Sequence, residues 1–284
     1  MSVEPPPEHV LAAFGLSGVQ PGALGDAWGG GWRCGEVVLS TVADNARAAW
    51  SARVRETLFV DGVRLARPVR STDGRYVVSR WRADTFVAGT PEPRHDEVVS
   101  AAVRLHEATG KLERPRFLVQ APGAPWMDAD VLMAADRAAW EENPLQSVPP
   151  GAWTAPPAAG GAASLELIEQ LATLRKPTRS PSQLVHGDLY GTVLLSGTAP
   201  PGITDIAPYW RPASWAAGVA VVDAIAWGGG DEDLIDRWSA LPEWPQMVLR
   251  AVMFRLAVYA LHPQSTAGAF PGLARTAGLV RMIL

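Results

Sequence analysis

The chain has 284 residues, of which 48% are hydrophobic and 19% charged, and its formal net charge at pH 7 is −4. This composition is typical of a globular protein with a large core and excludes a disordered chain, and the acidic balance gives no reason to expect nucleic acid or anionic lipid as a partner. A single cysteine, Cys34, cannot form an internal disulfide, and no apolar run reaches the roughly 18 residues that span a bilayer. The first residues lack the pattern of a signal peptide. We therefore expect a soluble cytoplasmic protein without a nucleic-acid or membrane partner.

The first 81 residues predict a small lobe of strands with one main helix. A short helix is expected over residues 7–14, and two strands over 24–28 and 32–40 flank the glycines at 29–31. Asp44 is expected to cap a helix that runs to residue 58. Strands over 63–69 and 76–81, with Asp73-Gly74 as a hairpin turn, complete an α+β unit.

From residue 93 onward the pattern is mainly helical. Helices are expected over 95–109, 127–141, 164–175, 216–227 and 243–262, and the last two should be largely buried. The Pro-, Ala- and Gly-rich segment 149–161 predicts a loop. We expect the boundary between the lobes near residues 82–93, which gives an N-terminal nucleotide-binding-type lobe of residues 1–83 and a helical C-terminal lobe of residues 84–284.

One short segment carries most of the chemical information. His186-Gly187-Asp188 leads into an apolar run, and Asp205 follows after a short loop. Kinase-type phosphotransferases use two carboxylates in this order, one at the acceptor hydroxyl and the other on Mg²⁺. With this ordered set and with the segments 29–39 and 208–212, the chain resembles the aminoglycoside phosphotransferase and choline kinase superfamily, and more narrowly an actinobacterial branch of it.

The resemblance implies the bilobal α+β fold of the protein kinases, with ATP and Mg²⁺ as cofactors if the protein is active. Asp188 would be the catalytic aspartate, His186 would orient its loop, and Asp205 would ligate the magnesium that bridges the phosphates. The glycines at 29–31 would form a turn over the phosphates, where a missing Cβ lets backbone amides approach closely. Trp81 would lie near the nucleotide cleft, where an aromatic wall can bind a planar ligand.

Two positions depart from the family pattern. Ser40 stands where the family has the lysine that holds the α- and β-phosphates, and Thr192 stands where it has an asparagine that ligates the metal. Residues 1–110 contain no lysine at all. A substitute cation in this lobe must therefore be an arginine, whose planar fork requires a different geometry. The candidates are Arg33, Arg53, Arg55 and Arg82.

Three functions remain open from the sequence. The chain is a small-molecule phosphotransferase with impaired or altered ATP chemistry, a pseudokinase that binds a ligand, peptide or partner protein, or a kinase fold that carries out another reaction. In the last case, pairing of Asp188 with Asp205 would raise one pKa and supply a general acid or base. Each feature also has a purely structural interpretation: the two aspartates as loop-capping acids, residues 29–31 as a tight hairpin, and Glu56 as a solvated helix charge. The acceptor substrate has no recognisable motif, and the segment 122–156 is one place where it would bind.

Overall fold

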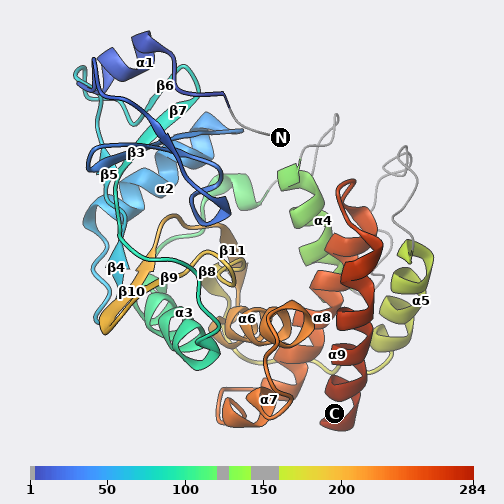
Figure 1. Cartoon of the computed structure of the whole chain (residues 1–284). Coiled ribbons are helices and arrows are strands. Elements are labelled where there is room, and N and C mark those ends of the chain that lie inside the picture. Colours follow the sequence, from blue (N-terminus) through green and yellow to red (C-terminus); the bar gives the residue numbers. More distant parts are fainter. Residues whose placement is uncertain (1–3, 120–127, 142–159) are drawn as a thin grey trace. The chain divides into compact units, whose positions relative to one another are not determined.

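The structure is a computed structural model, and it describes residues 4–119, 128–141 and 160–284 (Figure 1). Contacts divide the chain into two compact units. The first unit consists of residues 1–111 and 188–208, and the second consists of residues 112–187 and 209–284. These units are a grouping by contacts, and the lobe boundary at residues 83 and 84 stays a prediction. The loop expected over residues 149–161 lies almost entirely outside the described residues.

The first unit contains an antiparallel sheet in the order β1-β2-β3-β7-β5, with β6 also paired to β7. The strands are β1 (Gly22–Ala23), β2 (Trp32–Cys34), β3 (Val37–Thr41), β5 (Pro68–Val69), β6 (Val77–Val78) and β7 (Trp81–Thr85). The side chains of β3 and β7 alternate between the two faces of this sheet. Leu39, Trp81 and Ala83 face a buried cluster that includes residues of α1 (Glu8–Ala13), whereas Val38 belongs to a cluster with Trp28 and Leu194.

Two strand predictions in this region were wrong. The segment expected as one strand over 32–40 is a hairpin, because Gly35, at φ 66°, turns the chain between β2 and β3. The segment expected as a strand over 24–28 contains the short 3₁₀ helix η1 (Asp26–Trp28), in which the Trp28 amide donates to Gly25 O at 3.0 Å.

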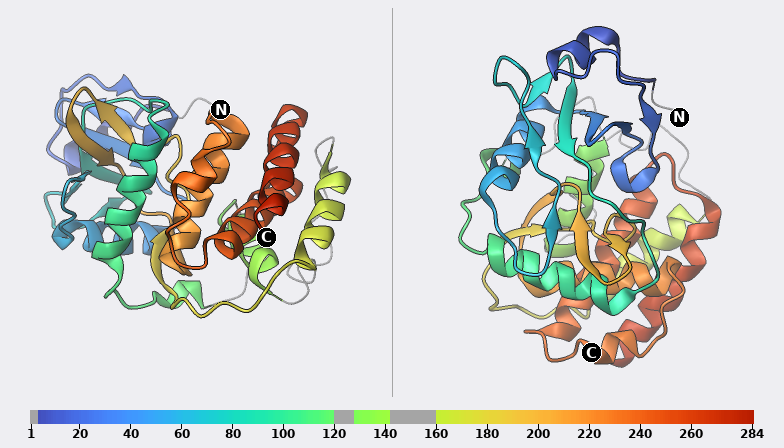
Figure 2. Two further views of the ribbon diagram at one scale, coloured as in Figure 1. Left: turned by 90° about the horizontal axis from the view of Figure 1, so that it is seen from below. Right: turned by 60° about the vertical axis from the view of Figure 1, so that its left-hand side comes forward.

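A second sheet of the first unit joins segments that are far apart in sequence. β4 (Arg64–Leu65) pairs in parallel with β10 (Ala199–Ile203), which pairs in antiparallel fashion with β9 (Leu194–Ser196). The right-hand view of Figure 2 shows this gold hairpin beside β4. The strand expected over 63–69 is therefore two short strands in different sheets. The turn at Asp73-Gly74 exists, but β5 and β6 on its two sides each pair with β7 rather than with one another.

The helices of the first unit match their predictions closely. α2 (Asn45–Thr57) begins at Asp44, whose carboxylate accepts hydrogen bonds from the amides of Ala46 and Arg47, as an N-cap should. At its other end, Arg67 donates to the carbonyls of Arg55 and Leu58 and so satisfies acceptors that the helix leaves open. α3 (His95–Thr109) ends at Gly110, as expected.

The second unit is mainly helical, and its core is α8 (Trp244–Leu261), which packs against α4, α5, α6 and α9. The other helices are α4 (Asp128–Trp140), α5 (Gly161–Ala172), α6 (Ala213–Trp227), α7 (Leu234–Arg237) and α9 (Phe270–Met282), with the 3₁₀ turns η2 (Arg116–Leu118) and η4 (Ala267–Ala269). β8 (Gln183–His186) pairs with β11 (Pro208–Arg211). As predicted, α6 and α8 are largely buried, and Asp223 on α6 forms a buried two-pronged pair with Arg255 on α8.

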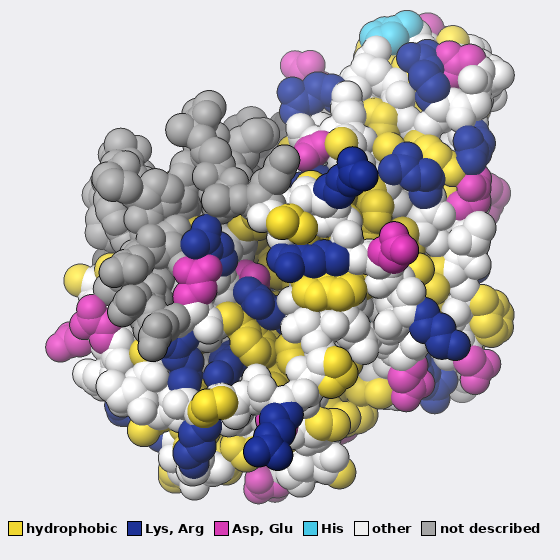
Figure 3. Space-filling view, turned by 180° about the vertical axis from the view of Figure 1, so that it is seen from behind, with side chains coloured by type: hydrophobic (Ala, Val, Ile, Leu, Met, Phe, Trp, Pro, Cys, Tyr) yellow, Lys and Arg dark blue, Asp and Glu magenta, His cyan; other side chains and the backbone are white. Residues whose placement is uncertain are grey.

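The described surface carries charges of both signs. On the face in Figure 3, basic and acidic side chains are interspersed rather than gathered in a patch of one sign. Within the described residues, no helix is both long enough and apolar enough to cross a membrane.

Candidate functional site

Asp188 and Asp205 lie in the two segments that flank the hairpin β9–β10. Asp188 stands six residues before β9 begins, Asp205 is the second residue after β10 ends, and the register pairs Leu194 with Gly202. Both segments leave the hairpin at its open end, away from its turn. The segment before Asp205 is fixed by Thr204, whose hydroxyl donates to Ala27 O at 3.1 Å in the glycine-containing turn.

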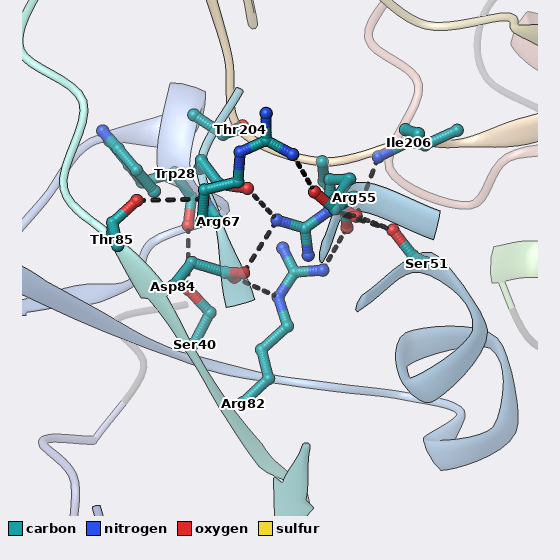
Figure 4. A network of polar contacts seen from close by, with 12 residues as sticks. Trp28, Ser40, Ser51, Arg55, Arg67, Arg82, Asp84, Thr85, Thr204 and Ile206 are labelled. Carbon is teal, nitrogen blue, oxygen red and sulfur yellow. Dashed lines mark hydrogen bonds and ion pairs between the residues drawn. The ribbon is translucent and has the colours of Figure 1, made fainter. Parts of the chain in front are cut away.

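Both carboxylate oxygens of Asp205 are already engaged by protein groups, among them Ser51, Arg82 and Ile206, which are labelled in Figure 4. Oδ1 accepts from the Ser51 hydroxyl at 2.5 Å and from the Ile206 amide at 2.8 Å, and Arg55 Nε lies 3.5 Å from it. Oδ2 accepts from Nη1 of Arg82. The Asp205 side chain is 37% exposed, so a metal ion that approached Oδ2 would meet the Arg82 guanidinium already bound there.

A second aspartate closes the network on its other side. Arg55 Nη1 donates to Asp84 Oδ1 at 2.7 Å and to Ala66 O at 2.6 Å, and Arg82 Nε lies 3.2 Å from Asp84 Oδ2. The side chain of Arg55 is 0% exposed and that of Asp84 is 3% exposed, so this half is fully desolvated. Two guanidinium groups and two carboxylates therefore balance one another in charge. We call these four residues, together with Ser51, the Asp205 network.

The charges of the network fix the ionisation of its members. Burial opposes the charged form of Asp205, but Arg82 and Arg55 outweigh it and hold the pKa of Asp205 well below its ordinary value. Burial also opposes the charge on Arg82, and the carboxylates of Asp205 and Asp84 raise its pKa above the ordinary value. Asp205 is therefore ionised and Arg82 protonated at neutral pH.

Ser40 lies directly across from Arg82 in the sheet. The two residues form a register pair between β3 and β7, so their side chains project from the same face. The Ser40 side chain is buried, and its hydroxyl donates to Trp28 O at 3.4 Å. Arg82 thus brings a cation to the face on which the family pattern has a lysine at position 40.

The glycines at 29–31 form a turn that is closed by its own backbone. The amides of Gly29, Gly30 and Gly31 donate to Asp26 O, Gly25 O and Trp28 O at 2.7, 3.3 and 3.1 Å. Gly29 and Gly30 have φ values of 60° and 68°, a conformation that glycine adopts without strain. Their amides do not point outward as a set of free donors, as a phosphate cradle would require.

The remaining expected site residues lie as follows. The hydroxyl of Thr192 donates to Leu189 O at 2.8 Å and lies 3.2 Å from Asp188 O, so it is hydrogen-bonded to the backbone of the turn in which Thr192 lies. Asp188 is half-buried. His186 ends β8 and is buried in the second unit, whereas Asp188 belongs to the first.

Trp81 does not lie with the Asp205 network. It is buried in the core against α1, because it neighbours Arg82 along β7 and side chains of consecutive strand residues point to opposite faces. Trp28 is likewise a core residue, stacked on Phe86 with ring centroids 5.9 Å apart. Neither tryptophan forms an open aromatic wall.

The arginine candidates separate clearly. Arg55 and Arg82 belong to the Asp205 network, whereas Arg33 pairs with Glu36 on the surface and Arg53 points to solvent from α2. The structure also explains Glu56, which lies in an exposed group with Arg70 and Tyr76 and not in the network. Glu56 is therefore partly exposed, as a solvated helix charge would be, but it is also ion-paired with Arg70.

Two members of the network, Ser51 and Asp84, did not follow from the motif. A signal for both was present in the sequence. Ser51 and Arg55 are four residues apart on one helix, so they share a face, and Asp84 is two residues from Arg82 on one strand. The fit to a metal ion is poor, because Arg82 already pairs with Asp205 and the described residues contain no group of three acidic, histidine or cysteine side chains arranged to hold one.

Comparison with solved structures identifies the fold. The chain matches spectinomycin phosphotransferase in its AMP-bound complex at 11% identity over 96% of both chains, with a TM-score of 0.60. It matches a thermostable variant of an aminoglycoside phosphotransferase, in ternary complex with ADP and hygromycin B, at 13% identity over 99% of this chain and 98% of that one, with a TM-score of 0.56. Choline kinase from Cryptosporidium parvum matches at 8% identity over 93% and 90% of the two chains, with a TM-score of 0.54.

These likenesses establish the fold and confirm the expected resemblance at that level. The chain has the protein-kinase-like α+β fold of the aminoglycoside phosphotransferases and choline kinases, with an antiparallel sheet in its N-terminal region and a larger helical region. No protein-family model matches the sequence, and no curated protein is significantly similar to it.

Proposed function

We propose that this chain is a relative of the small-molecule phosphotransferases whose ATP and Mg²⁺ chemistry is altered. The observation that carries the proposal is the pairing of Asp205 with Arg82, supported by the Ser51 hydroxyl and by the charge of Arg55. In a working kinase the aspartate at this place must ligate Mg²⁺, because phosphoryl transfer depends almost entirely on positioning and charge neutralisation. Here the Arg82 guanidinium pairs with the Asp205 carboxylate that would bind the metal ion.

Arg82 supplies the charge that Ser40 lacks. Its side chain is 15% exposed, and it projects from the strand next to Ser40. A guanidinium binds phosphate through two parallel hydrogen bonds, so a nucleotide phosphate can replace the Asp205 carboxylate on Arg82. In this proposal Asp188 remains the residue beside the acceptor hydroxyl, and His186 orients its loop.

A pseudokinase that binds a ligand or a partner without phosphoryl transfer is the second candidate. The closed glycine turn and the inward hydrogen bond of Thr192 favour it, because both remove groups that would contact phosphates or metal. The third candidate is an acid–base reaction in which pairing of Asp188 with Asp205 raises one pKa, and it loses Asp205 as the proton donor. Arg82 and Arg55 lower the pKa of Asp205, so Asp205 has no proton to donate near neutral pH.

The test is to follow the melting temperature of the full chain with ATP at millimolar concentration, in Mg²⁺ and in EDTA. Binding raises the melting temperature by mass action. We expect an equal rise in both buffers, lost in Arg82→Gln and kept in Arg53→Gln, which removes an exposed charge from α2. A rise that requires Mg²⁺, together with ATP turnover, would show an ordinary kinase. If the melting temperature rises in neither buffer, the proposal fails, and a pseudokinase that does not bind nucleotide is the remaining interpretation.

A reconstruction tests the same idea in the opposite direction. Ser40→Lys with Thr192→Asn restores two groups of the family pattern, but Asp205 is still held by Arg82. We therefore expect Mg²⁺-dependent nucleotide binding only when Arg82→Met is added to the other two changes. If the double variant alone gains it, the contact between Arg82 and Asp205 does not block the metal.

A further inference from the structure

A cavity of about 510 Å³ lies in the second unit, between α4, the η2 turn and β11. This volume is in the range of small-molecule sites, about 300–1,000 Å³. Aromatic side chains of Trp140, Tyr209 and Trp210 form part of its wall, and Leu118, Val119 and Met133 add apolar surface. A planar or apolar body therefore fits its interior.

The charges that line this cavity do not cancel. Arg211 donates to both oxygens of Asp136 at 2.7 Å, and Arg137 lies 2.5 Å from Glu141, so these four side chains form two neutral pairs. Arg114 is a third cation beside these two carboxylates. It donates to Leu118 O at 2.8 Å and acts on Asp136 through its charge, but within the described residues it forms no ion pair.

More positive charge lies behind the aromatic wall. The guanidinium carbons of Arg211 and Arg250 are each 4.9 Å from the centroid of the Trp140 ring. Arg175 also lies close, where it donates to the carbonyl of Ala139 at 3.3 Å near the end of α4. Burial first, and then the repulsion from Arg175, lowers the pKa of Arg250 to about 10. Arg175, Arg211 and Arg250 therefore place three guanidinium groups around Trp140, and Glu243 offsets part of their charge at Arg250.

We propose that this cavity binds a small molecule that combines a planar or apolar body with one anionic group. The aromatic wall would contact the body, and Arg114 would pair with the anion. A polycationic ligand would be repelled by the arginine side chains of the cavity. The proposal does not rest on nucleotide binding, because none of these residues belongs to the Asp205 network.

Three naphthalene probes of equal size separate charge from shape: 2-naphthoate, 2-naphthylmethanol and 2-naphthylmethylamine. Each is titrated into the full chain while the indole N–H resonances are followed by NMR, and Trp140 is assigned by its loss in Trp140→Phe. We expect saturable shifts of the Trp140 resonance with the carboxylate, and binding of the amine at least about tenfold weaker. Equal or tighter binding of the amine, or carboxylate shifts that leave Trp140 unmoved, would overturn the proposal.

Two substitutions at one exposed lining residue test the sign of the charge without risk to the core. Val119 is 66% exposed, so either Val119→Lys or Val119→Glu is tolerated by the fold. We expect the Kd of 2-naphthoate to fall roughly 2- to 10-fold with the lysine and to rise by a similar factor with the glutamate. Arg114→Gln should weaken it by about 3- to 10-fold, and Arg116→Gln, on the neighbouring η2 turn but outside the cavity lining, should not change it. An unchanged Kd in Arg114→Gln and in both Val119 variants would show that charge plays no part.

Discussion

Replacing Arg55 by methionine tests whether the buried half of the Asp205 network holds the first unit together. The change keeps most of the side-chain volume and removes the charge. It leaves the Asp84 carboxylate, 3% exposed, with Arg82 Nε at 3.2 Å as its remaining cation, and it removes the donor to Ala66 O. Breaking one partner out of a buried pair costs about 3–5 kcal/mol, because an uncompensated charge stays in a medium of low polarity.

The partner substitution should recover much of this loss. In Arg55→Met with Asp84→Leu neither charge is left in the buried half, and Arg82 keeps Asp205. We expect the loss of unfolding free energy in the double variant to be smaller, by about 2 kcal/mol, than the sum of the losses in the two single variants. Arg53→Met, on the exposed face of the same helix, should change stability by no more than about 0.5 kcal/mol.

Urea unfolding at pH 7 measures these values, with circular dichroism and tryptophan fluorescence as two probes whose transitions must coincide before a single free energy is used. A loss below about 1 kcal/mol in Arg55→Met would refute the argument. Strict additivity of the two substitutions would refute it as well, because uncoupled residues do not form an ion pair.

Three further predictions follow from close contacts and charge. Gly31→Ala should cost about 1–3 kcal/mol, because its new methyl would lie 2.5 Å from the buried serine hydroxyl of β3, whereas Gly25→Ala, with open space around it, should leave the melting temperature nearly unchanged. Asp205→Asn should lower stability at pH 7, and the difference in urea midpoint between this variant and the native chain should shrink as the pH falls below about 4. A pKa that is lowered in the folded state contributes stability above the ordinary pKa of aspartate, and this stability is lost as the carboxylate is protonated. A midpoint difference that stays constant with pH would contradict this reasoning. Gly187→Ala should lower the melting temperature, because a Cβ there would lie 2.5 Å from the Tyr209 ring; an unchanged value would show that the ring moves freely.

Elements with local signals were predicted well from the sequence. α2 begins at Asp44 and α3 ends at Gly110 because caps and apolar spacing are properties of neighbouring residues. The hairpin of β2 and β3 was missed because its local signal is weak. A single glycine at position 35 carries its turn, and the apolar alternation runs through it without a break.

The site was harder to predict, because its partners are brought together by tertiary structure. The motif led to Asp205, and the absence of lysine limited the substitute to an arginine, with four of them named as examples. Choosing among them required the phase of α2, which turns Arg55 inward and Arg53 and Glu56 outward, and the register of β3 with β7, which sets Arg82 opposite Ser40. No local pattern records that register. It depends on the hairpin that the sequence did not reveal.

The pairing of β4 with β10 has a consequence for how the chain is made. The first unit is discontinuous, since its last strands follow residues 112–187 in the order of synthesis. At about 5–20 residues per second, a ribosome takes on the order of 4–15 s to add that intervening stretch. During this interval the nascent N-terminal portion has neither the hairpin that completes its second sheet nor the aspartate that neutralises its inward arginines. Its folding therefore finishes only after much of the helical portion has been translated.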